Sequence, residues 1–284
     1  MTFVLARAER GTVTVRADFL VTQRAEGTDE VTHWPLLKLL ILDPSIVVGI
    51  AGSNGQGGVS NLLEAWANCE TAAELRQAIH DDGTPDRHYL MATADGELST
   101  WRGQHQGWAK SSYGRAWIGS PDAHSAHRPS PFDWKLSVQS PEVQRGATDW
   151  ARRHGFTEDE IDAVTSGRVA EELEAELQFD QALAAGDPEV GGLVAEAHLV
   201  DGQFRYTQTS ETRVLLGRPI RTEAEALASL ATTAPTASYR MGMADDTYPA
   251  ALRIEFTDTG AALTYRPGPD GYEKQWEPPR ERAG

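Results

Sequence analysis

The sequence predicts an α+β protein, a four-layer αββα sandwich in which two antiparallel sheets pack between layers of helices. Strand-like and helix-like segments follow one another in blocks: strands, two helices, strands, two helices, then strands again. A parallel βαβ protein would alternate single strands with single helices instead. The chain has 284 residues, 40% of them hydrophobic, which is enough for one large core with an appendage.

The first block contains two predicted hairpins. Residues 2–8 and 12–21 are rich in β-formers and flank a turn, and the polar residues 24–32 predict a loop. Residues 37–42 and 46–50 then predict a buried pair of strands, because both runs are apolar apart from Lys38 and Gly49.

Helices and further strands follow in the predicted order. Residues 59–67 and 71–80 have apolar positions at helical spacing, and the second segment opens with a capping box of Thr71 and Glu74. The remaining segments are a hairpin over 88–101, a strand over 115–120, helices over 140–155 and 157–186, and strands over 193–209.

Three regions are expected along the chain. Residues 1–212 form the main domain, and residues 213–266 form a C-terminal α/β extension, with a helix over 221–233 and a hairpin over 250–267. Residues 267–284 are rich in Pro, Gly and charge, which predicts a flexible tail.

The composition excludes several classes of function. With 42 acidic and 26 basic side chains the formal net charge is -16, which would repel a nucleic acid. Cys69 is the only cysteine, so an internal disulfide and a multi-cysteine metal site are excluded, and a reducing compartment is favoured. The longest apolar run is interrupted by Asp43 and Pro44. We therefore expect a cytoplasmic protein without nucleic-acid or membrane partners and without a cofactor.

Four stretches resemble proteasome β-subunits and the bacterial HslV-type peptidase, which are N-terminal-nucleophile (Ntn) hydrolases. They are TFVLARAERGTVTVRADFLVT at the start, then LLKLLILDPSIVVGIAGS, WIGSPDA and GDPEVGGLVAEAHLVDG, and they occur in the family's order over residues 2–210. Each stretch alone is a weak signal, but their order and spacing together indicate the family. The resemblance implies the Ntn hydrolase fold for the main domain.

The resemblance also implies roles for individual residues. Thr2, exposed by removal of Met1, matches the nucleophile, and its own α-amine matches the general base. Asp18 matches the orienting carboxylate, and Lys38 matches the lysine beside the nucleophile. Gly52 matches the glycine whose backbone N–H serves the oxyanion hole.

Further positions concern the terminal amine and the substrate. Ser120 and Asp187 match the pair that holds the amine, whereas Val190 stands where the family has another serine. Ile50 falls where the family lines its primary specificity pocket, which implies a preference for an apolar side chain before the cleaved bond.

These residue types suit amide hydrolysis for physical reasons. A threonine hydroxyl needs a base, and an α-amine with a reference pKa of about 7.7 to 8.0 can serve near neutrality. A nearby lysine disfavours protonation of that amine, and a carboxylate keeps the lysine ionised. An isolated Lys38 between apolar residues predicts either a buried partner or a solvent-facing position, because an unpaired buried charge is costly.

Other constellations are weaker. His124 and His127 have metal-like spacing, but no cysteine or paired carboxylate accompanies them, so a chance pair is favoured and no metal site is predicted. A G-x-S-x-G nucleophile motif is missing from the sequence.

The sequence therefore predicts a threonine peptidase that acts on peptide or protein substrates. The resemblance implies a homo-oligomeric ring, and the sequence does not say whether an ATPase partner exists. Two alternatives remain open: an Ntn amidase that acts on a small amide, and a catalytically silent scaffold. Val190 and the C-terminal extension favour the scaffold, whereas the retained Thr2, Asp18 and Lys38 oppose it.

Overall fold

The structure is a computed structural model. It describes residues 2–9, 11–24, 31–52, 55–84, 86–103, 106–111, 114–121, 152, 190, 193–206, 219–230, 240–243, 251–256, 258–269 and 271–280. Contacts divide the chain into two compact units, one of residues 1–120 with 188–284 and one of residues 121–187. The elements below belong to the first unit.

The first sheet has five antiparallel strands in the order β10-β1-β2-β11-β12. These are β1 (Phe3–Glu9), β2 (Thr12–Asp18), β10 (Arg115–Gly119), β11 (Val194–Val200) and β12 (Gln203–Tyr206). The β1–β2 hairpin was predicted, with Gly11 in the left-handed region at its turn. The sheet therefore joins the start of the chain to strands almost 200 residues away.

The second sheet also has five antiparallel strands, in sequence order from β5 to β9. They are β5 (Leu39–Asp43), β6 (Ile46–Gly52), β7 (Arg87–Thr93), β8 (Leu98–Trp101) and β9 (Trp108–Lys110). The sequence predicted the β5–β6 and β7–β8 hairpins, but it did not predict the short β9.

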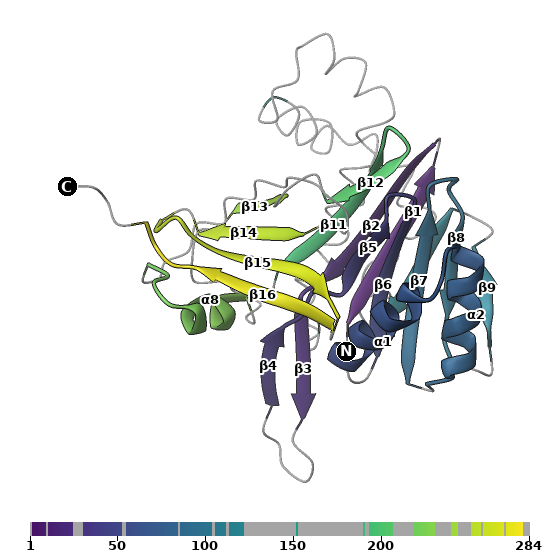
Figure 1. The fold of residues 1–284 in the computed structure, drawn as a ribbon, viewed down its shortest axis with the longest axis horizontal. Helices are drawn as coiled ribbons and strands as arrows, with labels where there is room; N and C mark the ends of the chain where they lie inside the picture. The colour runs from purple at the N-terminus through teal and green to yellow at the C-terminus, as the bar shows by residue number, and fades with distance from the viewer. Residues whose placement is uncertain are drawn as a thin grey trace, which may run out of the picture. The chain divides into compact units, whose positions relative to one another are not determined.

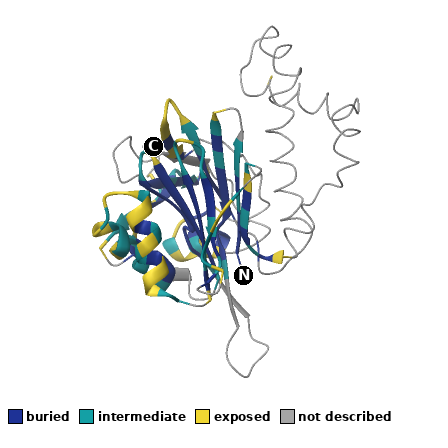
Figure 2. Cartoon of the chain, turned by 90° about the vertical axis from the view of Figure 1, so that its right-hand side faces the viewer, coloured by how far each residue is buried: buried dark blue, intermediate teal, exposed yellow. Residues whose placement is uncertain are grey.

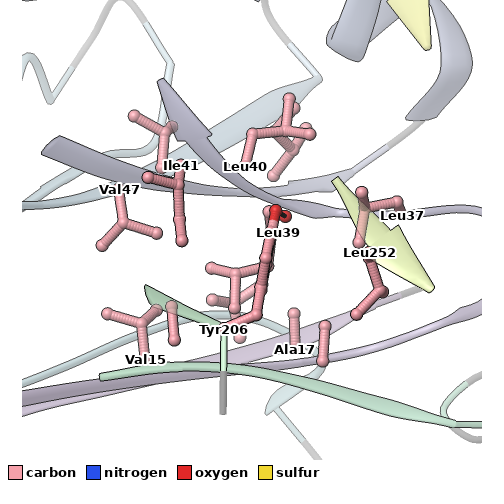
Figure 3. Close-up of a cluster of buried hydrophobic side chains, with 14 of the residues drawn as sticks. Val15, Ala17, Leu37, Leu39, Leu40, Ile41, Val47, Tyr206 and Leu252 are labelled. Atoms are coloured by element: carbon pink, nitrogen blue, oxygen red, sulfur yellow. Dashed lines mark hydrogen bonds between the residues drawn. The ribbon is translucent and has the colours of Figure 1, made fainter. Parts of the chain in front are cut away.

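The two five-stranded sheets pack face to face, with β1 and β2 over β5 and β6 (Figure 1). Their strands carry most of the buried residues, while the exposed residues gather on helices and turns (Figure 2). Figure 3 shows the apolar cluster between them, in which Val15 and Ala17 of β2 face Leu39 and Val47. The Tyr206 hydroxyl crosses this layer and donates to the carbonyl oxygen of Leu39 at 2.7 Å.

Two helices cover the second sheet. Helix α1 (Gly55–Ala67) contacts β6, and α2 (Ala72–Asp82) begins at the predicted cap, where Thr71 Oγ1 accepts from the Glu74 N–H at 3.2 Å. The Trp108 indole of β9 donates to the Arg76 carbonyl of α2 at 2.8 Å. Apart from residue 152, the predicted second helical layer, residues 140–186, lies outside the described residues, so one of the two helical layers is observed. None of the helices in the described parts of the chain is long and apolar enough to span a membrane.

The strand predicted over residues 12–21 was wrong in its extent. It breaks at Phe19, and a separate two-stranded sheet follows, formed by β3 (Leu20–Arg24) and β4 (Val31–Pro35). Residues 24, 31 and 32, which the sequence predicted as part of a loop, therefore belong to strands. The break arises because the Phe19 backbone turns to other partners: its N–H donates to the Leu193 carbonyl, and its carbonyl accepts from the Leu36 N–H, both at 2.8 Å.

The C-terminal region is a four-stranded antiparallel sheet with one helix. Its elements are α8 (Glu223–Leu230), β13 (Arg240–Met243), β14 (Leu252–Phe256), β15 (Ala261–Gly268) and β16 (Gly271–Glu277). The predicted helix and hairpin are present, but the flexible tail predicted from residue 267 was wrong for residues 271–277. They form β16, because the charged side chains point outward while Gly271 is buried and Trp276 packs on Phe256. The boundary predicted at residue 212 lies outside the described residues.

Candidate active site

Asp18 and Lys38 form a buried ion pair at the carboxyl end of β2. Lys38 Nζ lies 3.0 Å from Asp18 Oδ2, and the two side chains are 2% and 0% exposed. The same ammonium donates to the carbonyl oxygen of Leu20. The sequence predicted that a lysine between two apolar pairs needs a partner if it is buried, and Asp18 is that partner.

Asp18 also binds the first residues of the chain. Its other carboxylate oxygen, Oδ1, accepts a hydrogen bond at 2.8 Å from the backbone N–H of Phe3. Phe3 follows Thr2, which is buried with 5% of its surface exposed. One carboxylate therefore holds both Lys38 and the peptide unit that joins Thr2 to the rest of β1.

Strand β10 holds Thr2 from the other side. The Ser120 backbone N–H donates to the Thr2 carbonyl oxygen at 2.8 Å. Gly119 precedes it with φ 103, and a Cβ there would lie 1.7 Å from the same carbonyl oxygen. Only glycine fits this close approach, because a side chain would overlap the Thr2 backbone.

Ile50 and Gly52 are connected to Lys38 through the backbone of β6. The Ile50 N–H donates to the Lys38 carbonyl oxygen at 2.9 Å. Ile50 faces α1, since a Cβ on Gly58 would lie 3.1 Å from its Cγ2. Gly52 ends β6 with φ 108, and a Cβ there would lie 2.1 Å from the Asp86 carbonyl oxygen, so this position also requires glycine.

Burial and charge act on Lys38 in opposite directions. Loss of hydration lowers the pKa of the Lys38 ammonium, and this is the larger effect. The Asp18 charge and its hydrogen bond raise the same pKa and so oppose the shift. The site thus contains an amine that releases its proton more easily than a surface lysine does.

The structure brings together most of the residues that the sequence singled out. Thr2, Asp18, Lys38 and Ser120 are linked by hydrogen bonds or by one intervening peptide unit, and Gly52 follows two residues after Ile50. Asp187 lies outside the described residues, so its predicted pairing with Ser120 stays a prediction. Val190 is fully buried and, as the sequence indicated, offers no hydroxyl.

Sequence reasoning missed three contributors to the site. Gly119 lies in the WIGSPDA stretch that carries the resemblance, but no role in the site was predicted for it, although a glycine that ends a strand beside a candidate site residue is a usable signal. Leu20 contributes only its backbone carbonyl, and Phe19 contributes the break between two strands. Their side-chain types therefore gave no sign of these roles in the sequence.

The described part of the chain holds no group of three or more His, Cys, Asp and Glu side chains that could bind a metal ion. His124 and His127 lie outside the described residues.

Comparison with known proteins gives similarity of structure at low sequence identity. No protein-family model matches the sequence, and no curated protein matches it. The structure is similar to eukaryotic HslV from Trypanosoma brucei, with 15% identity and a TM-score of 0.40 over 69% of this chain and 98% of that one. It is also similar to the Anbu Gly-1 mutant from Hyphomicrobium sp. strain MC1, with 14% identity and a TM-score of 0.47. That match covers 73% of this chain and 85% of the other.

At these values the likeness by itself assigns neither an activity nor a site. Both have to be inferred from the residues of this chain.

Proposed function

We propose that the protein is a threonine-type Ntn hydrolase that cleaves peptide bonds. The observation that supports this most is the double role of Asp18, whose two oxygens bind the Phe3 N–H and the Lys38 ammonium. This arrangement ties the residue after Thr2 to a buried amine. A strand that merely begins at Thr2 has no need of it.

The energetic cost of the arrangement favours a functional explanation. A buried ion pair often contributes little net stability, because desolvation offsets most of the attraction between the charges. An apolar pair of similar size would fill the same space at no such cost. A charged lysine and carboxylate retained in a dry position next to Thr2 therefore fit catalysis better than they fit packing.

The proposed reaction requires that Met1 is removed, which leaves Thr2 with a free α-amine. The amine takes the proton of the Thr2 hydroxyl, and Oγ1 attacks the substrate carbonyl carbon. The resulting oxyanion accepts a hydrogen bond from the Gly52 N–H. Loss of such a donor typically costs about 3 to 4 kcal/mol of transition-state stabilisation. The protonated amine returns its proton to the leaving nitrogen, and the C–N bond breaks.

An ester between Thr2 and the acyl part of the substrate remains after this step. Water, deprotonated by the same α-amine, attacks the ester carbonyl, and the ester bond breaks with return of a proton to Thr2 Oγ1. Lys38 favours the neutral form of the α-amine by like-charge repulsion, and Asp18 fixes the lysine in place.

The proposed substrates are peptides or proteins, and the proposed assembly is a homo-oligomeric ring. Ile50 beside Gly58 of α1 supports an apolar specificity pocket, because it contributes only aliphatic surface there. A peptide-library digest that shows a clear preference for acidic or basic residues before the cleaved bond would contradict this part of the proposal.

The test is the intact mass of the purified native protein before and after treatment with a threonine-directed epoxyketone or β-lactone. Loss of Met1 and one adduct, mapped to Thr2 by fragmentation, is the expected result. A retained Met1 without an adduct would overturn the proposal. The Thr2→Ala variant is the matched control, since it must lose the adduct while its melting temperature stays close to that of the wild type.

A silent scaffold is the second candidate, and one observation favours it. Val190 is fully buried where the family has a serine, so one hydroxyl that would tune the amine is replaced by a methyl group. A scaffold would retain ring assembly, measured by native mass spectrometry, but give no adduct. An amidase for small amides would label at Thr2 yet leave a peptide library uncut.

A further inference from the structure

Phe19 lies between the two groups that bind the Lys38 ammonium. Asp18 precedes it and supplies the carboxylate, and Leu20 follows it and supplies the carbonyl oxygen. Because Phe19 is one residue from each, any movement of its backbone moves both groups. The fixed position of Phe19 is therefore a condition for holding Lys38.

The C-terminal sheet holds Phe19 through Tyr265 of β15. The two rings meet edge to face, with centroids 5.9 Å apart and an interplanar angle of 67°, and both side chains are fully buried. Tyr265 pairs across the sheet with Leu252 of β14. Leu252 belongs to the same apolar cluster as Leu37, the residue before Lys38 (Figure 3).

The sheet thus makes a direct contact with the segment that carries Asp18. Tyr265 contacts the residue after Asp18, and Leu252 belongs to the same buried core as the residue before Lys38. We propose that the C-terminal sheet is a working part of the candidate site, in which Tyr265 is a positioning residue that holds the segment from Asp18 to Leu20 around Lys38. Its catalytic consequence rests on the proposed function, but its effect on Lys38 does not.

The ring of Tyr265, and not its hydroxyl, carries this role. The hydroxyl is buried and has no hydrogen-bond partner among the residues that the structure describes. Burial raises the pKa of this phenol, with smaller contributions from Tyr272 and Glu223, so it stays neutral and offers no charge to the site. Phenylalanine should therefore replace Tyr265 without loss, whereas alanine should not.

Lys38 itself provides a direct readout. Burial is the main cause of its lowered pKa, and Asp18 is the charged group that acts on it within the described residues. Removing the Tyr265 ring frees the segment from Asp18 to Leu20 and admits water. A weaker Asp18 contact would lower the pKa of Lys38, but burial is the larger effect, so the entry of water should raise that pKa toward the value of a surface lysine. A loss of stability elsewhere in the sheet should leave that pKa unchanged.

The experiment is a ¹³C NMR titration of the full chain labelled with [ε-¹³C]lysine. The sequence holds only Lys38, Lys110, Lys135 and Lys274, so the Lys38→Arg variant assigns the signal of Lys38 by its disappearance. In the wild type and in Tyr265→Phe, we expect Lys38 to titrate below the ordinary lysine pKa of 10.5, and in Tyr265→Ala we expect its midpoint to move up toward that value.

Phe256→Ala is the matched control, because Phe256 is also fully buried in this sheet but packs on Trp276. It should lower the melting temperature and leave the Lys38 midpoint in place. An unchanged midpoint in a folded Tyr265→Ala, or the same shift in Phe256→Ala, would overturn the proposal. If Tyr265→Ala does not fold, Phe19→Leu decides, since it removes the other ring of the pair and must shift the midpoint in the same direction.

Labelling of Thr2 separates this proposal from the proposed function. If the wild type reacts with the epoxyketone, Tyr265→Ala should react at least about tenfold more slowly at neutral pH, which is part of the roughly 10²- to 10⁴-fold that a well-placed general base contributes. Tyr265→Phe should react at the wild-type rate. If the wild type does not react, the proposed function fails, and the lysine titration still decides whether Tyr265 positions the segment around Lys38.

Discussion

Asp18 and Lys38 meet in the interior of the protein, with Oδ2 and Nζ 3.0 Å apart and almost no exposure of either side chain. The second oxygen of Asp18 binds the backbone N–H of Phe3, so the pair is fixed to the residue that follows Thr2. The ion pair is therefore a structural link between the start of the chain and the turn before β5.

Thr2 is expected to be the only residue that the epoxyketone modifies. Thr2→Ala should abolish labelling and turnover, and Thr2→Ser should retain part of both, because serine keeps the hydroxyl. Intact mass and the hydrolysis rate of a fluorogenic peptide measure the two effects. An adduct that persists in Thr2→Ala would assign the nucleophile elsewhere.

Asp18→Asn is expected to be strongly destabilising, because it leaves the buried Lys38 without its counter-charge. Removing one partner of a buried ion pair typically costs about 3 to 5 kcal/mol. The double variant Asp18→Asn/Lys38→Met should lose less free energy of unfolding than the sum of the losses in the two single variants, because it leaves no unpaired charge. Urea denaturation of the four proteins measures the coupling, and additive costs would contradict a direct interaction.

Gly119→Ala is expected to disturb Thr2, because the added Cβ would lie 1.7 Å from the Thr2 carbonyl oxygen. Gly11→Ala is the matched control: Gly11 also has a positive φ, of 83, but a Cβ there meets nothing within 4 Å. A positive φ alone costs a non-glycine residue about 1 to 3 kcal/mol. Gly119→Ala should therefore lower the melting temperature more than Gly11→Ala and should slow Thr2 labelling, whereas equal effects would argue against the contact.

His88 is expected to make stability depend on pH in the acidic range. Burial, aided by the nearby Arg102, lowers the pKa of His88 in the folded protein below its ordinary value of 6.5. As the pH falls below about 6.5, the unfolded chain gains a proton that the folded protein resists, so the free energy of unfolding decreases. In His88→Gln the free energy of unfolding should decrease less as the pH is lowered. Urea denaturation between pH 7.5 and 5 measures this, a range that begins about one unit above the ordinary histidine pKa. An identical pH dependence in both proteins would contradict the shift.

Much of the main domain could be predicted because its signals are local. Alternating or continuous apolar residues identified β1, β2, β5 and β6, and the capping box identified the start of α2. An isolated lysine between apolar neighbours indicated that Lys38 needs a partner if it is buried, and the family resemblance predicted that Asp18 is this partner. These features depend only on residues close in sequence or on a motif of fixed spacing.

The C-terminal sheet could be predicted only in part, for a physical reason. Residues 271–277 are polar enough to suggest a loose tail, since an edge strand buries little of its surface and carries charge on its exposed face. It forms because β15 supplies a full ladder of backbone hydrogen-bond partners. The local sequence pattern of β16 does not indicate that β15 will lie beside it.

By itself, the sequence determined the β1–β2, β5–β6 and β7–β8 hairpins, the need of Lys38 for a partner and the order of the candidate residues along the chain. The tertiary structure decided which of these residues meet. It placed Gly119 against the Thr2 carbonyl, turned the chain at Phe19 and set Tyr265 against that ring. Such contacts join residues up to 246 positions apart, the difference between 265 and 19, and they form only where folded sheets bring surfaces of matching shape together.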